Sequence, residues 1–109
     1  MSDGIFEVSF RSSIQDFGGG LIVIKDGSVN GGDAHFLYRG TFTESGGIAK
    51  ATIKVDKWKA GNISVVKIDN FQIEFTGSIA NGLLNLSGHV SGQPTLTITV
   101  QGRKVGEVA

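Results

Sequence analysis

Apolar and polar residues alternate along most of this chain, in short stretches with a period of two. Between Phe6 and Arg11, large apolar side chains occupy the even positions and polar side chains the odd ones. A strand with one face on a core and the other in water has this period. Similar alternation recurs in residues 36–43, 49–56, 71–76, 84–90 and 95–101. The pattern predicts about seven or eight short strands and no amphipathic helix.

Short clusters of turn-forming residues separate these stretches. Asp26-Gly27 and Asn81-Gly82 are signals for two-residue hairpins, because Asp, Asn and Gly tolerate the positive φ angles of a type I′ turn. Gly31-Gly32-Asp33 predicts a break or bulge with positive φ angles, in which Asp33 bonds nearby amides. Further turns are expected at 18–20, 44–47 and 92–94. Because its 17 glycines are spread along the chain, glycine here separates strands rather than forming a linker.

Strands joined at hairpin spacing predict an all-β fold, an antiparallel up-and-down barrel of about eight strands, with a sandwich as the alternative. Gly40 and Gly88 suit the bends where barrel strands curl. The length of 109 residues indicates a single domain, with an ordered core over 3–101 and a frayed tail over 102–109. Residues 58–68 lose the period, and we interpret them as a connection whose apolar side chains plug one barrel end: Trp58, Ile63, Val65 and Val66.

Charge and cysteine content narrow the function. Ten Lys and Arg balance ten Asp and Glu, whereas a protein that grips phosphate backbones needs clustered basic residues. Cysteine is absent, which excludes disulfides and thiolate metal sites and favours a reducing compartment. No signal-peptide or membrane-spanning stretch is seen, so we expect a cytoplasmic protein that binds neither nucleic acid nor membrane. We interpret the densest basic segment as the solvent-exposed face of a strand. It contains Lys50, Lys54, Lys57 and Lys59, with Asp56 among them.

Catalytic and metal-binding patterns are missing from the sequence. His35 and His89 are the only histidines, and neither has the ligand spacing of a metal site or the partners of a nucleophile–base pair. The glycine run at 18–20 opens a strand, whereas phosphate-binding loops open a helix or end in Lys-Ser or Lys-Thr. We therefore expect no cofactor, no metal and no enzymatic activity.

One apolar face has functional promise. Its residues form either a packed core or the lining of a cavity for a small apolar ligand, with Tyr38 as the polar group, and with His35 and Arg39 near the mouth. These candidate lining residues are Phe6, Phe10, Phe36, Tyr38, Phe42, Phe71, Ile73 and Phe75.

A second apolar feature points to self-association. The run Leu21-Ile22-Val23-Ile24 is apolar on both faces of its predicted strand, so one face must be covered by something other than the core. Zero net charge adds little repulsion between copies. We expect these four residues to form a homodimer interface.

The segment from Asp3-Gly4-Ile5-Phe6 through Gly31-Gly32-Asp33 to Tyr38-Arg39-Gly40 resembles the negative regulators of type III secretion. Ser64-Val65-Val66 and the stretch from Asp69 to Ile73 are also similar to that family, and the likeness covers nearly the whole chain. The resemblance implies a lipocalin-like barrel, a homodimer, and a regulator that binds a transcriptional activator rather than DNA.

This chain departs from that family at one loop. The characterised member carries a run of acidic residues there, whereas Thr43-Glu44-Ser45-Gly46-Gly47 has a single acid. We therefore place the protein-binding surface elsewhere, at Asn30, Gly31, Gly32, Asp33 and Trp58. Trp58 is either an exposed anchor for a partner or a lid on the barrel. A small apolar-ligand-binding barrel is the alternative function.

Overall fold

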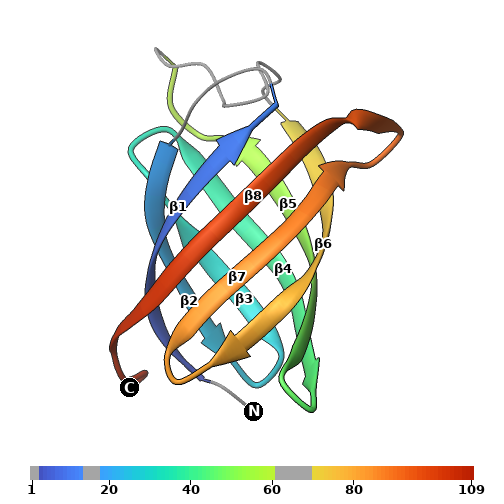
Figure 1. The fold of residues 1–109 in the computed structure, drawn as a ribbon. Helices are drawn as coiled ribbons and strands as arrows, with labels where there is room; N and C mark the ends of the chain where they lie inside the picture. Colours follow the sequence, from blue (N-terminus) through green and yellow to red (C-terminus); the bar gives the residue numbers. More distant parts are fainter. Residues whose placement is uncertain (1–2, 14–17, 61–69) are drawn as a thin grey trace.

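The computed structural model describes residues 3–13, 18–60 and 70–109, and it is a closed barrel of eight antiparallel strands (Figure 1). Each strand pairs with the next along the chain, and the last pairs with the first. The all-β barrel predicted from the alternation is therefore confirmed, and the described residues contain no helix. The strands are β1 (Gly4–Ser12), β2 (Gly18–Lys25), β3 (Ser28–Gly32), β4 (Phe36–Ser45), β5 (Ile48–Lys57), β6 (Asn70–Ala80), β7 (Leu83–Val90) and β8 (Gln93–Gly106).

The tight turns follow the local chemistry of the sequence. Asp26 and Asn81 have φ angles of 51° and 53°, and the glycine after each is also positive, as a type I′ hairpin requires. Gly46 and Gly47, between β4 and β5, are positive as well. These turns lie at the lower end of the barrel in Figure 1, where β2, β4 and β6 finish.

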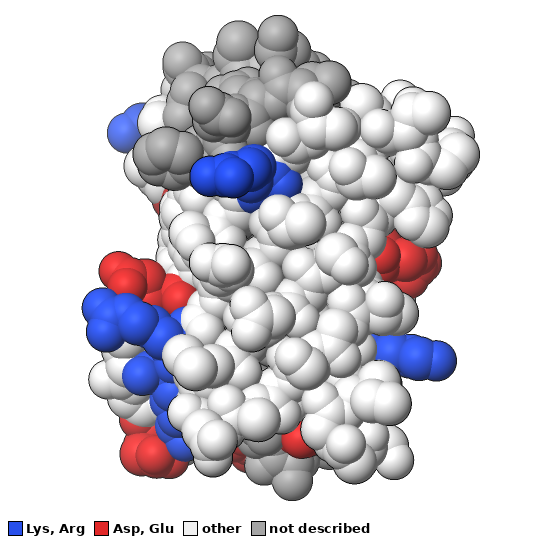
Figure 2. Space-filling model, viewed as in Figure 1, with Lys and Arg blue, Asp and Glu red and all other residues white. Residues whose placement is uncertain are grey.

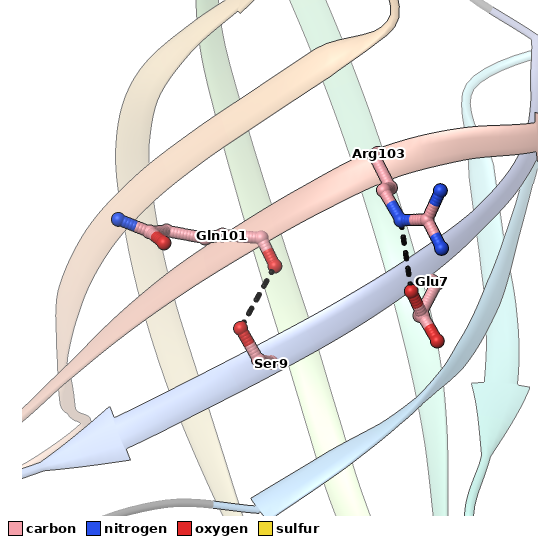
Figure 3. A network of polar contacts seen from close by, with 4 residues as sticks. All are labelled: Glu7, Ser9, Gln101 and Arg103. Carbon is pink, nitrogen blue, oxygen red and sulfur yellow. Dashed lines mark hydrogen bonds and ion pairs between the residues drawn. The ribbon is translucent and has the colours of Figure 1, made fainter.

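Strand β8 corrects one sequence-based prediction, because the chain does not fray after Gln101. It stays in the sheet to Gly106 and pairs with β1, where Arg103 Nε donates to Glu7 Oε1 at 2.9 Å (Figure 3). The alternation of apolar residues is lost there because Lys104 occupies the inward position of β8 between two glycines. Its backbone N–H donates to the Gly82 carbonyl at 2.7 Å, and its ammonium pairs with Glu107. A lysine stem can cover apolar surface in this way while its charge stays in water.

Several strand glycines allow neighbouring strands to approach closely. A Cβ on Gly40 would lie 1.8 Å from the Thr52 carbonyl oxygen, and one on Gly88 would lie 2.0 Å from that of Glu74. Both glycines therefore lie where the neighbouring backbone leaves no room for a side chain. Gly31 differs from the prediction: it has no positive φ angle, but its Cβ would lie 2.1 Å from the Leu21 carbonyl oxygen. Glycine is therefore required at position 31 because no side chain fits there, and not because the backbone adopts an unusual conformation.

The lower half of the barrel is filled with side chains. Phe6, Ile24, Ala49 and Leu84 are at most 1% exposed. Ile79 completes this packed end, and Phe42 and Leu84 lie at its border with the unfilled interior. No helix among the described residues is long and apolar enough to span a membrane. The unfilled part of the interior lies towards the upper end, where β1, β3, β5 and β7 finish (Figure 1).

Candidate functional site

A cavity of about 160 Å³ occupies the barrel between its middle and its upper end. The described residues of its walls are mostly apolar, and every strand contributes to them. The lining residues are Val8, Phe10, Gly18, Ile22, Val29, Asp33, Phe36, Tyr38, Phe42, Ala51, Ile53, Val55, Phe71, Ile73, Phe75, Leu84, Leu86, Ile98 and Val100.

Seven of the eight residues expected to line a cavity do so. The exception is Phe6, which lies opposite Ile22 on one side and Lys104 on the other, in the packed lower half. The aliphatic residues that complete the wall, such as Ala51 and Ile98, belong to inward positions of the predicted strands. Alternation indicates which face a residue lies on, but not whether the space before it is filled.

Glycines on β2 make room for two aromatic rings of the cavity. A Cβ on Gly18 would lie 2.7 Å from the Phe10 ring, and one on Gly20 would lie 3.1 Å from the Tyr38 ring. The two rings meet edge to face, with centroids 5.7 Å apart. The glycine run at 18–20 is therefore part of a strand under aromatic side chains, not the turn predicted from the sequence.

The polar end of the cavity is organised by Asp33, which follows β3. Its Oδ1 accepts from the backbone N–H groups of His35 and Phe36, at 2.9 and 2.8 Å, and its Oδ2 accepts from the Tyr38 hydroxyl. Its own carbonyl oxygen accepts from Trp58 Nε1 at 3.2 Å. One residue thereby joins the β3–β4 connection, the cavity and the exposed tryptophan.

Burial and the neighbouring Asp33 carboxylate raise the pKa of the Tyr38 hydroxyl well above its usual range. The phenol stays protonated and keeps donating to Asp33. His35 lies in the same connection, and its carbonyl oxygen accepts from the Trp58 backbone N–H at 2.8 Å. Arg39 does not reach the mouth, which corrects the prediction. It faces outward and forms an ion pair with Asp56 at 3.1 Å, because even and odd positions of β4 face opposite sides.

Trp58 is 52% exposed and does not line the cavity. Its indole ring is held beside the β3–β4 connection by the bond to Asp33, at the rim of the barrel. The other residues expected to plug this end, Ile63, Val65 and Val66, lie outside the described residues.

The apolar run on β2 divides between the two faces of the sheet. Ile24 is fully buried and Ile22 lines the cavity, which removes both from any outer surface. Leu21 and Val23 face outward, and Leu21 is 52% exposed. Of the four residues expected at a homodimer interface, only these two are therefore placed to touch another molecule.

Three exposed apolar side chains gather around Gly32, and we call them the apolar patch: Leu21, Leu37 and Trp58. Gly32 lies between Leu21 and Leu37 in the register of β2, β3 and β4, and Trp58 bonds the next residue. Beside Leu21 the outer surface is hollowed along Gly18–Gly20 and across β1 and β8 to Leu83 and Asn85 on β7. Sequence alternation marks Leu37 as outward, but only the register places it beside Leu21.

Acidic and basic side chains lie at the margins of the face in Figure 2, several of them side by side. The face in Figure 2 has a broad uncharged area over β7 and β8, with Lys and Arg at its margins. Lys54 faces outward on β5, whereas Lys57 lies at the rim, its ammonium 5.7 Å from the Phe36 ring centroid. Within the part of the chain that the structure describes, no three potential metal ligands of the His, Asp or Glu type come together.

Comparison with known proteins gives one result that covers the chain. No curated protein matches it. The model of one protein family, described as "T3SS negative regulator, GrlR", matches residues 1–108, which is essentially the whole sequence. This agrees with the resemblance carried by the Gly-Gly-Asp segment and the strands around it. The chain belongs to the GrlR family of negative regulators of type III secretion.

Proposed function

We propose that this protein represses type III secretion without enzymatic activity, in the cytoplasm, by binding and retaining another protein, and that it does not bind DNA. Membership of a negative-regulator family supports the regulatory part. A net charge of zero argues against a grip on phosphate backbones, and on the face in Figure 2 acidic side chains lie beside basic ones. A transcriptional activator of secretion genes is the partner that the family resemblance suggests.

The apolar patch is the observation that carries this proposal. Exposed aromatic and aliphatic side chains that cluster on a small domain mark contact surfaces more often than isolated ones do. Trp58 has the size and rigid geometry of residues that dominate protein interfaces. The neighbouring Asn30 is exposed on the outer face of β3 and would lie at the rim of the contact. The acid at Glu44 belongs to the opposite end of the barrel, close to the turn between β4 and β5.

We place the homodimer contact on the same side, through the outward residues Leu21 and Val23, with Trp58 left at the rim for the partner. Burying a fully exposed leucine contributes about 1.5–3 kcal/mol, so the 52% exposed Leu21 contributes roughly half of that, and a symmetric contact counts it twice. Leu21→Lys should therefore give a folded monomer in sedimentation at micromolar concentration. Ile48→Lys is the matched control, because Ile48 is similarly exposed, at 61%, but begins β5 at the opposite end of the barrel from the patch.

Trp58→Ala tests partner binding separately from dimerisation. The variant should remain a dimer with nearly unchanged stability and should lose the protein captured from a lysate by the unmodified chain, together with repression of a secretion-gene reporter. A dimeric Trp58→Ala variant that captures and represses normally would contradict this surface. Tight, salt-sensitive binding of the unmodified protein to duplex DNA would contradict the whole proposal.

A carrier of small apolar ligands remains the second candidate. The barrel is compatible with that function, and the cavity is the feature that brings it into consideration. Lipocalin-like behaviour of this kind does not exclude regulation, because a cavity and an outer surface are separate sites.

A further inference from the structure

The size of the cavity limits what could occupy it. A volume of about 160 Å³ is close to that of an engineered apolar cavity, about 150 Å³, that stays dry and binds benzene. Drug-sized ligands occupy pockets of roughly 300 Å³ or more. One six-membered ring with a short substituent fits this space, whereas a long acyl chain or a sterol does not.

The chemistry of the polar end limits the occupant further. Among the described residues that line the cavity, the polar side chains are Asp33 and Tyr38, and the single Tyr38 O–H is already donated to Asp33. The oxygens of both groups can accept another hydrogen bond, but neither group has a donor left. Because burial and Asp33 keep the Tyr38 phenol protonated, this balance persists at neutral pH.

The same end disfavours anions. No Lys or Arg is among the described residues that line the cavity, and the Asp33 carboxylate would repel a second carboxylate. The Lys57 ammonium lies over the Phe36 ring, and Lys57 is not part of the lining. A neutral molecule with one hydrogen-bond donor meets both requirements.

We infer that the cavity binds a small neutral ring compound of the phenol class, with the ring among the aromatic and aliphatic walls and the hydroxyl donating to the Asp33 carboxylate. This inference does not depend on the proposed repression. The Asp33 carbonyl oxygen also accepts a hydrogen bond from the Trp58 indole, so a molecule bound in the cavity is expected to change the environment of that exposed side chain.

Three probes of similar size test the inference on the full-length protein: phenol, anisole and benzene. Titrations followed by NMR should shift the methyl signals of Val55 and Ile73, which line the cavity, and the indole N–H signal of Trp58. Phenol should bind about tenfold more tightly than anisole, which has the oxygen but no donor; tenfold corresponds to 1.4 kcal/mol. No shift of the cavity methyl signals with any probe would overturn the inference.

Asp33→Asn provides the sharpest control. The amide oxygen can still accept from the backbone N–H groups of His35 and Phe36, while the amide nitrogen donates to Tyr38 and frees the Tyr38 O–H. The cavity then presents a donor that the oxygen of either probe can accept, so the preference for phenol over anisole should largely disappear. An unchanged preference for phenol in this folded variant would overturn the assignment of Asp33 as the anchor.

Ala51→Val tests the location of the ring. Ala51 lines the cavity, and two added methyl groups occupy part of its volume. Binding of all three probes should weaken at least tenfold while the protein remains folded. Equal binding by this variant would mean that the probes sit elsewhere and would overturn the inference.

Discussion

Replacing Ala51 with valine should stabilise the barrel, whereas the same replacement at Ala49 should destabilise it. The two alanines lie two positions apart on β5 and face the same interior. Ala49 is fully buried in the packed lower half, and Ala51 lines the cavity. The intrinsic preference of valine for strands is the same at both sites, so any difference reports the local packing.

The magnitude follows from the two surroundings. Valine adds two carbon atoms, and burying them in unfilled space contributes about 0.8 kcal/mol each, or about 1.6 kcal/mol at Ala51. At Ala49 the same atoms must displace packed neighbours, which costs about 1–3 kcal/mol. The variants should therefore differ in free energy of unfolding by about 3 kcal/mol. At about 4 °C per kcal/mol for a domain of this size, their Tm values should differ by about 12 °C.

Urea unfolding monitored by circular dichroism measures both variants against the unmodified protein. Comparable m-values would show that the denatured states are alike and that the comparison is valid. If Ala51→Val proves as destabilising as Ala49→Val, the interior beside Ala51 is already filled, and the reasoning about the cavity is refuted.

Two further predictions concern Tyr38 and Gly40. The pKa of Tyr38 is raised in the fold, so the protonated hydroxyl stabilises the folded state fully at pH values below the unfolded pKa of about 10. Above that pH the free energy of unfolding falls, by up to about 1.4 kcal/mol per pH unit. Tyr38→Phe should be less stable than the unmodified protein by about 1–2 kcal/mol at neutral pH, and it should lack that decline. If the difference in free energy of unfolding between the two proteins stays constant up to about pH 11, the coupling is refuted. Gly40→Ala should cost about 3 kcal/mol or more, since its Cβ would lie 1.8 Å from the Thr52 carbonyl oxygen, whereas Thr41→Ala at the exposed neighbour should cost under about 1 kcal/mol. A mild effect of Gly40→Ala in urea unfolding would mean that the strands do not approach so closely.

The strands and turns could be predicted from the sequence because their causes are local. An inward Phe42 beside an outward Thr43, or the pair Asn81-Gly82 between two strands, carries its meaning within a few residues. The cavity has no such local cause. Its space depends on Phe10 lying over Gly18, and those residues meet only when β1 and β2 pair.

The end of the chain shows the converse case, in which a strand continues although its hydrophobic pattern does not. Beyond Gln101 the inward positions hold glycines and Lys104, so the hydrophobic alternation fails although the backbone remains paired with β1. The sequence indicates that alternate residues of the apolar run on β2 face opposite sides of the sheet. It does not indicate whether Leu21 and Val23 or Ile22 and Ile24 face outward. That choice is fixed by the pairing of Ile22 with the buried Phe6.

Closure of the sheet restricts how any other protein can recognise this one. Each described strand has a hydrogen-bonded neighbour on both sides, so an incoming peptide finds no backbone edge to extend by strand addition. Recognition of the barrel wall must be read from side chains, which can be removed one at a time without disturbing the backbone pairing. The same closure removes the edges through which a chain of zero net charge would otherwise stack into aggregates.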